Sequence, residues 1–378
     1  MEFQRYKLSQ LITIKNGKDY KHLEEGDVPV FGSGGYMCSV SSYLYDKVSI
    51  LLPRKGTLSN IQYFNNGKFW TVDTCFYSII NESLCNPYYL YRHLRSLDLS
   101  GYDTGASIPS MTQKTYNGIK VMLPSLPAQH RIASILSDYD NLIENNNKRI
   151  RLLEQMAENL YKEWFVRFRF PGHENAEFEN GLPKGWVVKR MSDFCDVTDG
   201  THDTPKPVDD GVPLITGKCI SNGFIDYNEA YSISLEDHEK IKKRSGLSTG
   251  DILFSNIGTV GNCCIVDYDR EFSVKNVIIF KPNDIIKTAY LYFWMMSDSM
   301  QNVFSTQTNG ASQQFVGLTF MRRYKILVPE QRILFAFGEK INPLVEQKKK
   351  LHRINQNLSR QRDLLLPRLM SGKLEVKV

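Results

Sequence analysis

The sequence has few cysteines and no long apolar run, and both deficits narrow the class of protein. Its 378 residues include seven cysteines, and no two of them form a C-x-x-C pair. This usage is typical of reduced thiols and argues against a cysteine-rich zinc site. No run of 18 uncharged apolar residues is present, so we expect no membrane span. The polar start Met1–Arg5 lacks the apolar core of a secretion signal, and we expect a cytoplasmic location.

Charge of either sign is in only slight excess. The chain carries 47 Lys and Arg against 41 Asp and Glu, a net charge of +6. This balance permits binding to nucleic acid without requiring it. Hydrophobic residues make up 42% and aromatic residues 12%, which argues against a disordered chain. The length is sufficient for two or three domains with cores of their own.

Complete catalytic motifs are missing. Gly211 and Gly217-Lys218 stand at the wrong spacing for a phosphate-binding P-loop, and Cys219 replaces the required Ser or Thr. Phe31–Gly35 matches the F-x-G-x-G pattern of methyl-donor binding only in part. Asn86–Tyr89 lacks the second proline of the N-P-P-Y loop of amino-methyltransferases. These departures argue against nucleotide hydrolysis and methyl transfer on this chain.

One histidine lies among side chains that could support reactivity. His202 lies in the polar segment Asp199–Thr204, whose acidic residues would suit a metal or an acid–base pair. The other six histidines do not stand at ligand spacing around it, and a loop or DNA-contact role is favoured. We therefore expect no catalytic residue and no metal site on this chain.

An internal repeat is the most informative pattern. Gly105-Ala106-Ser107 and the following Ile119–Pro124 recur 205 residues later as Gly310-Ala311-Ser312 and Tyr324–Pro329. Shorter phrases repeat at offsets of 184 to 202 residues. These are Val28-Pro29 with Val212-Pro213, Ile50-Leu51 with Ile252-Leu253, and Tyr89–Tyr91 with Tyr290–Tyr292. The change in offset predicts about 18 extra residues in the second copy, including the charged stretch Glu236–Arg244.

The body of each copy reads as short strands and helices. β-Branched and aromatic residues predict strands at 48–52, 70–80, 251–255 and 274–280. Residues 88–97 and 289–300 are predicted to form helices. Each copy is therefore expected to be a mixed α/β globule.

Each copy ends in a long helical stretch with apolar residues at alternating spacings of three and four. The predicted seam positions are Leu136, Tyr139, Ile143, Asn146, Ile150, Leu153, Leu160 and Trp164 in the first stretch, and Phe337, Leu344, Gln347, Leu351, Ile354, Leu358 and Leu365 in the second. The two helices are expected to pack on each other, with Asn146 and Gln347 fixing their register. Residues 136–164 would span about 43 Å, on the order of one turn of B-DNA. The alternative is that each helix only caps its own domain.

The predicted fold class is mixed α/β (α+β), with two globules in a pseudo-twofold repeat and two long helices packed as an antiparallel coiled coil. Residues 171–185 contain five Gly or Pro and are expected to be a linker. The predicted division is 1–130 for the first globule, 131–170 for the first helix, 171–185 for the linker, 186–330 for the second globule, 331–370 for the second helix and 371–378 for a tail.

Taken together and in order, these phrases resemble the DNA specificity subunit of type I restriction–modification enzymes over essentially the whole chain. The first copy carries Gly105-Ala106-Ser107, Leu123-Pro124 and Gln129–Ile132. The second carries Gly181–Trp186, Asp199–His202 with Thr204-Pro205, Gly250–Leu253 with Gly258–Gly261, Gly310–Gln314 and Val328–Ile333. The first copy departs at Gly17–Tyr20 and at Ser107–Pro109, which suggests that the two halves read different bases.

The resemblance implies a division of labour. Each globule would be a target-recognition domain that reads one half of a split double-stranded DNA site in the major groove. The helix pair would set the spacer between the half-sites and dock two methyltransferase subunits, through which motor–nuclease subunits join. S-Adenosylmethionine, ATP and Mg would then act on those partner subunits, and no cofactor is expected on this chain.

Loop residues with basic, amide or hydroxyl groups are the candidates for DNA contact. In the first copy they are Lys15, Asn16, Lys18, Tyr20, Ser33, Tyr36, Arg54, Lys55 and Thr57. In the second they are Thr201, His202, Asp203, Thr204, Lys218, Ser255, Asn256, Lys275, Asn276, Gln313 and Gln314. Arg54 or Lys55 suits guanine O6 and N7, and the two glutamines suit adenine N6 and N7. The alternative for each is a solvated turn.

Three alternatives remain open at this point. Residues 331–378 carry 11 basic and 4 acidic side chains, either as a solvated helix face or as a surface for phosphates or an acidic partner. The chain as a whole is either a DNA-recognition subunit or a scaffold of two modules that is indifferent to DNA. A nuclease or methyltransferase acting alone is the enzyme alternative.

Overall fold

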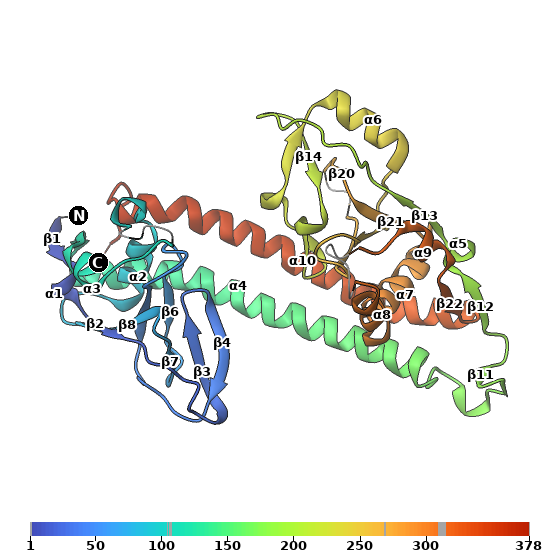
Figure 1. The fold of residues 1–378 in the computed structure, drawn as a ribbon, viewed down its shortest axis with the longest axis horizontal. Helices are drawn as coiled ribbons and strands as arrows, with labels where there is room; N and C mark the ends of the chain where they lie inside the picture. Colours follow the sequence, from blue (N-terminus) through green and yellow to red (C-terminus); the bar gives the residue numbers. More distant parts are fainter. Residues whose placement is uncertain (1, 104, 106–107, 268–269, 309–314, 378) are drawn as a thin grey trace. The chain divides into compact units, whose positions relative to one another are not determined.

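The computed structural model describes residues 2–103, 105, 108–267, 270–308 and 315–377 (Figure 1). The chain divides into two compact units, which we call unit 1 (Met1–Asn146 with Arg353–Val378) and unit 2 (Asn147–His352). Each unit contains one globule together with a segment of each long helix, α4 (Leu126–Tyr161) and α10 (Gln331–Met370). Within the described residues, no helix is long and apolar enough to cross a membrane.

Unit 1 is built on two small sheets and a separate strand pair. A four-stranded antiparallel sheet has the order β2 (Ile12–Asn16), β8 (Cys75–Ile80), β5 (Ser49–Pro53), β6 (Gln62–Phe64). A three-stranded sheet has the order β4 (Gly35–Val40), β3 (Glu25–Gly32), β7 (Trp70–Thr71), in which β3 and β7 are parallel. The strand pair is β1 (Phe3–Lys7) with β9 (Lys120–Pro124). The short helices are α1 (Leu8–Leu11), α2 (Pro87–Arg95), η1 (Ser100–Tyr102) and α3 (Gln113–Gly118).

The core of unit 1 explains why these segments fold together. Strand β5 is buried over its whole length, as the apolar run Ile50–Pro53 that follows Ser49 predicts for a central strand. Tyr89 of α2 and Tyr116 of α3 are fully buried against it, together with Leu136 of α4. Leu369 at the end of α10 belongs to the same cluster, so the second long helix closes the core of the first globule.

Unit 2 repeats this plan. Its four-stranded sheet has the order β13 (Asp196–Asp199), β21 (Val277–Lys281), β18 (Ile252–Ser255), β19 (Cys263–Ile265). Its three-stranded sheet is β17 (Tyr231–Ile233), β14 (Val212–Ile215), β20 (Ser273–Val274), and β12 (Val187–Arg190) pairs with β22 (Lys325–Val328). Two hairpins are added, β10 (Phe178–Glu179) with β11 (Leu182–Pro183), and β15 (Ile220–Ser221) with β16 (Phe224–Ile225). The helical elements are η2 (Lys162–Val166, a π-helix), η3 (His173–Asn175), α5 (Met191–Phe194), η4 (Gly217–Cys219), η5 (Tyr227–Glu229), α6 (Leu235–Ser245), α7 (Ile285–Met296), α8 (Asp298–Thr308) and α9 (Leu318–Arg323).

The strand orders confirm the internal repeat. Both units combine a four-stranded antiparallel sheet with a three-stranded sheet that contains one parallel pair. Helix α6, which begins at the cap Ser234 and ends at Gly246 (φ +51°), covers the predicted charged insertion. Its Ile241 packs on the three-stranded sheet of unit 2, in a cluster with Leu214 of β14 and Ile233 of β17. Figure 1 shows α6 near β14. Residues 41–48, between β4 and β5 of unit 1, form no helix.

Three predicted elements are interrupted. The predicted strand 70–80 is divided into β7 and β8 by a turn at 72–74. Similarly, 274–280 is broken at Asn276, whose positive φ of 51° is left-handed backbone. The predicted helix 289–300 ends at Ser297, whose extended conformation separates α7 from α8. Residues 171–185, expected as a plain linker, contain η3 and the β10–β11 hairpin.

Within each unit the segments of the two long helices run antiparallel. In unit 1, Asp140 pairs with Arg362, and six residues further along α4 Asn146 pairs with Asn355. In unit 2, Glu154 pairs with Lys348 and Tyr161 packs on Phe337. Within each unit, the residue number along α4 rises from one pair to the next while the residue number along α10 falls. The two helix segments therefore run in opposite directions.

The predicted seam of the second helix is wrong at two positions. Gln347 is exposed and Ile354 is 37% exposed, whereas Lys348 and Asn355 are each 8% exposed. The buried positions are Lys348 and Asn355, which lie four residues after Leu344 and Leu351. The predicted positions Gln347 and Ile354 lie three residues after them. Asn146 therefore pairs with Asn355, and the expected partner Gln347 faces away from the seam.

Candidate nucleic-acid interface

The predicted loops of unit 1 are arranged around Gly17, and we call the bend at Gly17 against the β7–β8 turn a glycine corner. Strand β2 ends at Asn16, and Gly17 then passes so close to the β7–β8 turn that a Cβ would lie 2.0 Å from the Val72 carbonyl oxygen. Lys18 N donates to Thr71 O at 2.8 Å, and Trp70 Nε1 donates to Lys18 O at 2.8 Å. The backbone of 16–18 is therefore held by a main-chain contact and by the Trp70 side chain, and the side chains of Lys15 and Lys18 are exposed.

A second loop contributes Arg54, Lys55 and Thr57, all exposed. Arg54 Nη1 donates to the carbonyl oxygen of Asp73 at 3.3 Å, in the same turn that holds Gly17. Gly56 N donates to Pro109 O at 2.9 Å. The predicted residues of this loop are thereby brought beside the glycine corner.

The β3–β4 turn completes the arrangement. Asn60 Nδ2 donates to Ser33 O at 2.6 Å, and Gln62 Nε2 donates to Gly32 O at 3.0 Å. Tyr36 is 63% exposed, and its hydroxyl lies 3.1 Å from Ser39 Oγ. Tyr20, in contrast, is half-buried against the core of the three-stranded sheet and serves packing.

The corresponding corner in unit 2 has the same backbone construction. A Cβ on Gly200 would lie 2.2 Å from the Val274 carbonyl oxygen. Thr201 N donates to Val274 O at 3.0 Å, and Asn276 N donates to Thr201 O at 3.1 Å. The Gly17–Lys18 and Gly200–Thr201 pairs thus occupy equivalent places against the turn that follows the parallel strand of the small sheet.

Polar side chains at this second corner form a chain of contacts. His202 Nε2 lies 2.9 Å from Asp199 Oδ2, and His202 Nδ1 lies 3.0 Å from Asn276 Oδ1. Arg244, from α6, donates to the other Asp199 oxygen at 2.6 Å. Both ring nitrogens of His202 are thereby engaged by oxygen atoms. Among the described residues, no group of three or more His, Cys, Asp or Glu side chains is placed to hold a metal ion.

Four further candidates of unit 2 are exposed or half-buried, namely Asp203, Thr204, Lys218 and Lys275. Lys275 Nζ donates to Thr204 Oγ1, which joins two of them. Asp203 is exposed and its backbone N donates to Thr201 Oγ1 at 3.1 Å. Lys218 forms an ion pair with Glu229 at 3.5 Å. Asp203, Thr204 and Lys275 lie next to His202 and Asn276 in the chain, so groups of mixed charge flank the His202 contacts.

Burial removes three predicted residues from the interface. Ser255 is fully buried, and its hydroxyl lies 3.2 Å from Thr259 Oγ1. Asn256 is 5% exposed and donates from Nδ2 to Val316 O at 3.2 Å. Thr201 is 6% exposed and caps the local turn. Their side chains stabilise the loops. Gln313 and Gln314 lie outside the described residues.

Three residues that contribute to these surfaces were not predicted from the sequence. Gln113, the first residue of α3, donates from Nε2 to Asn16 Oδ1 at 2.9 Å. Asp103 accepts the backbone N–H groups of Gly105 and Ser110, which lower the pKa of its carboxyl and shape the loop that contacts Gly56. Gln113 and Arg244 lie in helices and Asp103 is acidic, so none of them matches the pattern of a basic, amide or hydroxyl group in a loop, although the cap Thr112 signals the start of α3.

Comparison with known proteins decides the family. The model of the type I restriction modification DNA specificity domain matches residues 1–155 and again 183–356. The chain belongs to the type I restriction–modification DNA specificity family. The two matched ranges coincide with the two copies of the repeated topology, and the resemblance inferred from the sequence is confirmed.

Named relatives of this family align with most of the chain. The MjaIX specificity subunit of Methanocaldococcus jannaschii is 25% identical, over 95% of this chain and 84% of the relative. The HindI specificity subunit of Haemophilus influenzae is 20% identical, over 78% and 79%. A crystal structure of a type I restriction–modification S subunit from M. genitalium shares the fold with a TM-score of 0.63, at 14% identity, over 97% of this chain and 96% of that one.

Proposed function

We propose that this chain is the DNA-reading subunit of a type I restriction–modification complex and that its two globules read the two halves of a split site. The observation that carries the proposal is the duplicated glycine corner. Gly17 and Gly200 make the same close approach to a backbone carbonyl, yet the side chains presented beside them differ. The same backbone arrangement with different side chains suits two DNA-binding surfaces that prefer different bases.

The chemistry of the first surface favours contact with phosphates and guanine. Lys15, Lys18, Arg54 and Lys55 are exposed cations on adjacent loops of unit 1. Cations of this kind neutralise phosphates, and an arginine or lysine in the major groove suits guanine O6 and N7. The second surface presents Lys275, Asn276 and His202, in which an amide and an imidazole stand beside one cation. Its preference should therefore differ from that of the first.

The long helices are proposed to set the spacer and to dock two methyltransferase subunits, through which motor–nuclease subunits join. Exposed apolar side chains on α4 and α10 suit a protein partner; they include Leu142, Leu152, Met156, Phe335, Ile354 and Leu364. S-Adenosylmethionine, ATP and Mg are assigned to those partners. In this proposal the chain determines which DNA sequence the complex binds and carries out no catalytic step.

The direct test is to sequence the modified adenines in DNA from cells that express this chain with its cognate methyltransferase. A split motif, with two short defined halves and a fixed gap, supports the proposal. Exchanging residues 1–130 for those of a relative should change one half only. An active methyltransferase that leaves the DNA unmethylated, or binding that ignores duplex DNA, would favour the scaffold alternative.

Substitution of Arg54 tests whether the surface of unit 1 recognises one particular half-site. Arg54→Gln should reduce methylation of sites carrying the preferred base of the first half by about 5- to 150-fold, as expected for a lost bidentate base contact. The second half should remain unchanged. Lys120→Gln, on the separate β1–β9 strand pair, is the matched control and should leave both halves intact. Equal loss of both halves in Arg54→Gln would contradict the assignment.

A further inference from the structure

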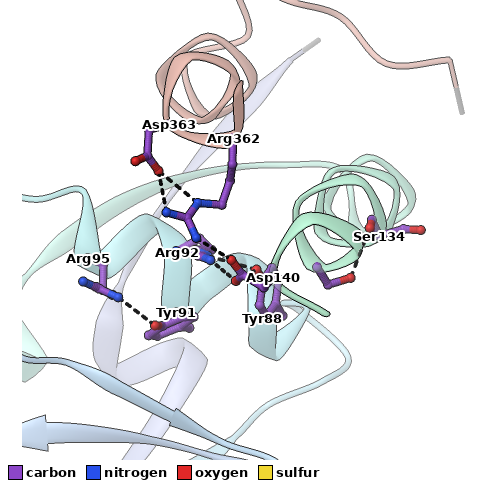
Figure 2. A network of polar contacts seen from close by, with 9 residues as sticks. Tyr88, Tyr91, Arg92, Arg95, Ser134, Asp140, Arg362 and Asp363 are labelled. Atoms are coloured by element: carbon purple, nitrogen blue, oxygen red, sulfur yellow. Dashed lines mark hydrogen bonds and ion pairs between the residues drawn. The ribbon is translucent and has the colours of Figure 1, made fainter. Parts of the chain in front are cut away.

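In each unit, a charged cluster among the described residues joins the globule to both long helices. In unit 1 the centre is Asp140 of α4 (Figure 2). Its Oδ2 accepts from Tyr88 and Arg92 of α2, and its Oδ1 accepts from Arg362 of α10 at 2.7 Å. Three elements therefore converge on one carboxylate.

The burial of this cluster makes its geometry demanding. The Arg92 side chain is 8% exposed, that of Arg362 20% and that of Asp140 27%. Arg92 also donates from Nε to the Tyr88 hydroxyl at 3.0 Å, and Arg362 is shared with Asp363. A buried guanidinium that loses its carboxylate is strongly disfavoured, so the arrangement holds α2 in one place on the helices.

In unit 2 the centre is Lys348 of α10. Its Nζ lies 2.5 Å from Glu154 of α4, and its side chain is 10% exposed. The same ammonium lies 4.6 Å from the Phe224 ring centroid and 5.8 Å from that of Tyr292. Phe224 belongs to the β15–β16 hairpin and Tyr292 to α7. One cation thus joins both helices to two elements of the globule.

The internal repeat shows that these clusters are not inherited equivalents. The offset of 201 that relates Tyr91 to Tyr292 places Phe293 at the position of Arg92. The same offset, taken from Arg131 and Arg332, places Ile341 at the position of Asp140. Phe293 and Ile341 lie in the apolar core of unit 2. The fold therefore does not need a charge at the Asp140 position, because the equivalent place in unit 2 is filled by hydrocarbon.

We propose that Asp140 and Lys348 are positioning residues that fix the orientation of each recognition globule on its own helix segments, and thereby the DNA spacer that the subunit accepts. The inference rests on the proposed function. An ion pair with several buried partners has one good geometry, whereas an apolar contact permits small rotations. A rotation of a globule would bring its reading loops to a different base-pair step. Loss of either centre should therefore relax the choice of spacer while the base preference of each half remains.

The experiment measures methylation of three DNA duplexes that share both half-sites and differ only in spacer, with the wild-type length, one base pair less and one more. The complex of the full chain with its methyltransferase is used throughout. For Asp140→Asn we expect the preference for the wild-type spacer to fall by about tenfold, since the buried guanidinium groups lose the charge that orients them. Lys348→Met should have the same effect through unit 2. Single-base changes in each half-site should be discriminated as by the wild type.

Matched controls separate positioning from general damage. Asp138→Asn and Lys350→Met remove exposed charges from the same helices and should leave spacer preference unchanged. Arg92→Gln combined with Asp140→Asn removes the more buried of the two ion pairs, while Arg362 keeps its contact with Asp363, and should restore thermal stability without restoring spacer preference. This pair keeps the test valid even where Asp140→Asn alone folds poorly.

The outcomes distinguish the two proposals. A wild-type complex that ignores spacer length or methylates no split site would overturn the proposed function itself. A wild-type complex that is strict in its spacer, with Asp140→Asn and Lys348→Met equally strict, would overturn the positioning role alone. Equal loss of methylation on all three duplexes, with a lowered melting temperature, would show that the clusters serve stability only and would also overturn it.

Discussion

Asn146 donates from Nδ2 to Oδ1 of Asn355 at 2.9 Å, and both side chains are buried between the long helices. Asn355 also donates to the Ile143 carbonyl oxygen at 3.4 Å. A buried amide pair in an apolar seam lowers stability relative to leucine and favours one register over its neighbours. This pair lies between the Asp140–Arg362 and Glu154–Lys348 ion pairs in the order of residues along both helices.

The amide pair leads to a first prediction. Asn146→Leu should lower the free energy of unfolding by about 1–3 kcal/mol, because the Asn355 oxygen loses the donor that it accepts from. The double substitution Asn146→Leu with Asn355→Leu should recover this loss or exceed wild-type stability. Chemical denaturation of the three variants measures both effects. Additive losses in the double variant would show that the two amides do not interact.

The glycine corners give a second prediction. Gly17→Ala and Gly200→Ala each place a methyl group about 2 Å from a backbone carbonyl oxygen, which cannot move as a side chain can. Each should cost about 1–3 kcal/mol of folding stability, the usual range for overpacking. Gly34→Ala is the control, because no atom lies within 4 Å of its added Cβ. Thermal melting compares the three, and equal melting temperatures would contradict the close approach.

Two histidines predict how stability depends on pH. Burial lowers the pKa of His93 below its usual 6.5, and burial together with the nearby Lys348 lowers that of His352. The unfolded chain therefore binds more protons than the folded chain just below pH 6.5. Their favourable contribution is complete above that pH and is lost as the pH falls toward the folded pKa values. Denaturation between about pH 7.5 and 5.5 should show falling stability, less steeply in His93→Gln with His352→Gln.

The cysteines give a fourth prediction. Burial raises the pKa of the Cys75, Cys85, Cys195 and Cys264 thiols to about 12, and that of Cys263 well above its usual value. Cys219 is buried, whereas Cys38 is partly exposed. Titration of the folded chain with a thiol reagent near pH 7.5 should therefore modify Cys38 alone, since the thiolate is the reactive form. The Cys38→Ser variant should react only after denaturation, when six thiols become available.

The repeat and the strands around it could be predicted from the sequence because short phrases recur in order, such as Tyr89–Tyr91 and Tyr290–Tyr292. The second helix shows where that reasoning ends. Apolar periodicity selects Ile354, which is 37% exposed, and passes over Lys348, Asn355 and Arg362 because they are polar. Their partners Glu154, Asn146 and Asp140 lie on a distant part of the chain. Only the folded helices reveal that each of these three residues has a polar partner on the other helix.

The candidate interface was predictable in its loops but not in the role of each side chain. Arg54 and Lys55 are exposed as expected, whereas the equally polar Ser255 and Asn256 are turned inward to hold the turn at 257–259 and the backbone at Val316. Residue type sets what a side chain offers to DNA. Its direction depends on the strand end from which the loop leaves.

The glycine corners at Gly17 and Gly200 have a consequence for how the sequence of such a chain diverges during evolution. Since Gly17 and Gly200 are tied to their neighbours through main-chain atoms, replacement of Lys18 or His202 removes few of the contacts that define the loop. New side chains can then be sampled at these positions while the fold is inherited unchanged. A lineage of such chains should diversify in its reading loops faster than in the glycines that support them.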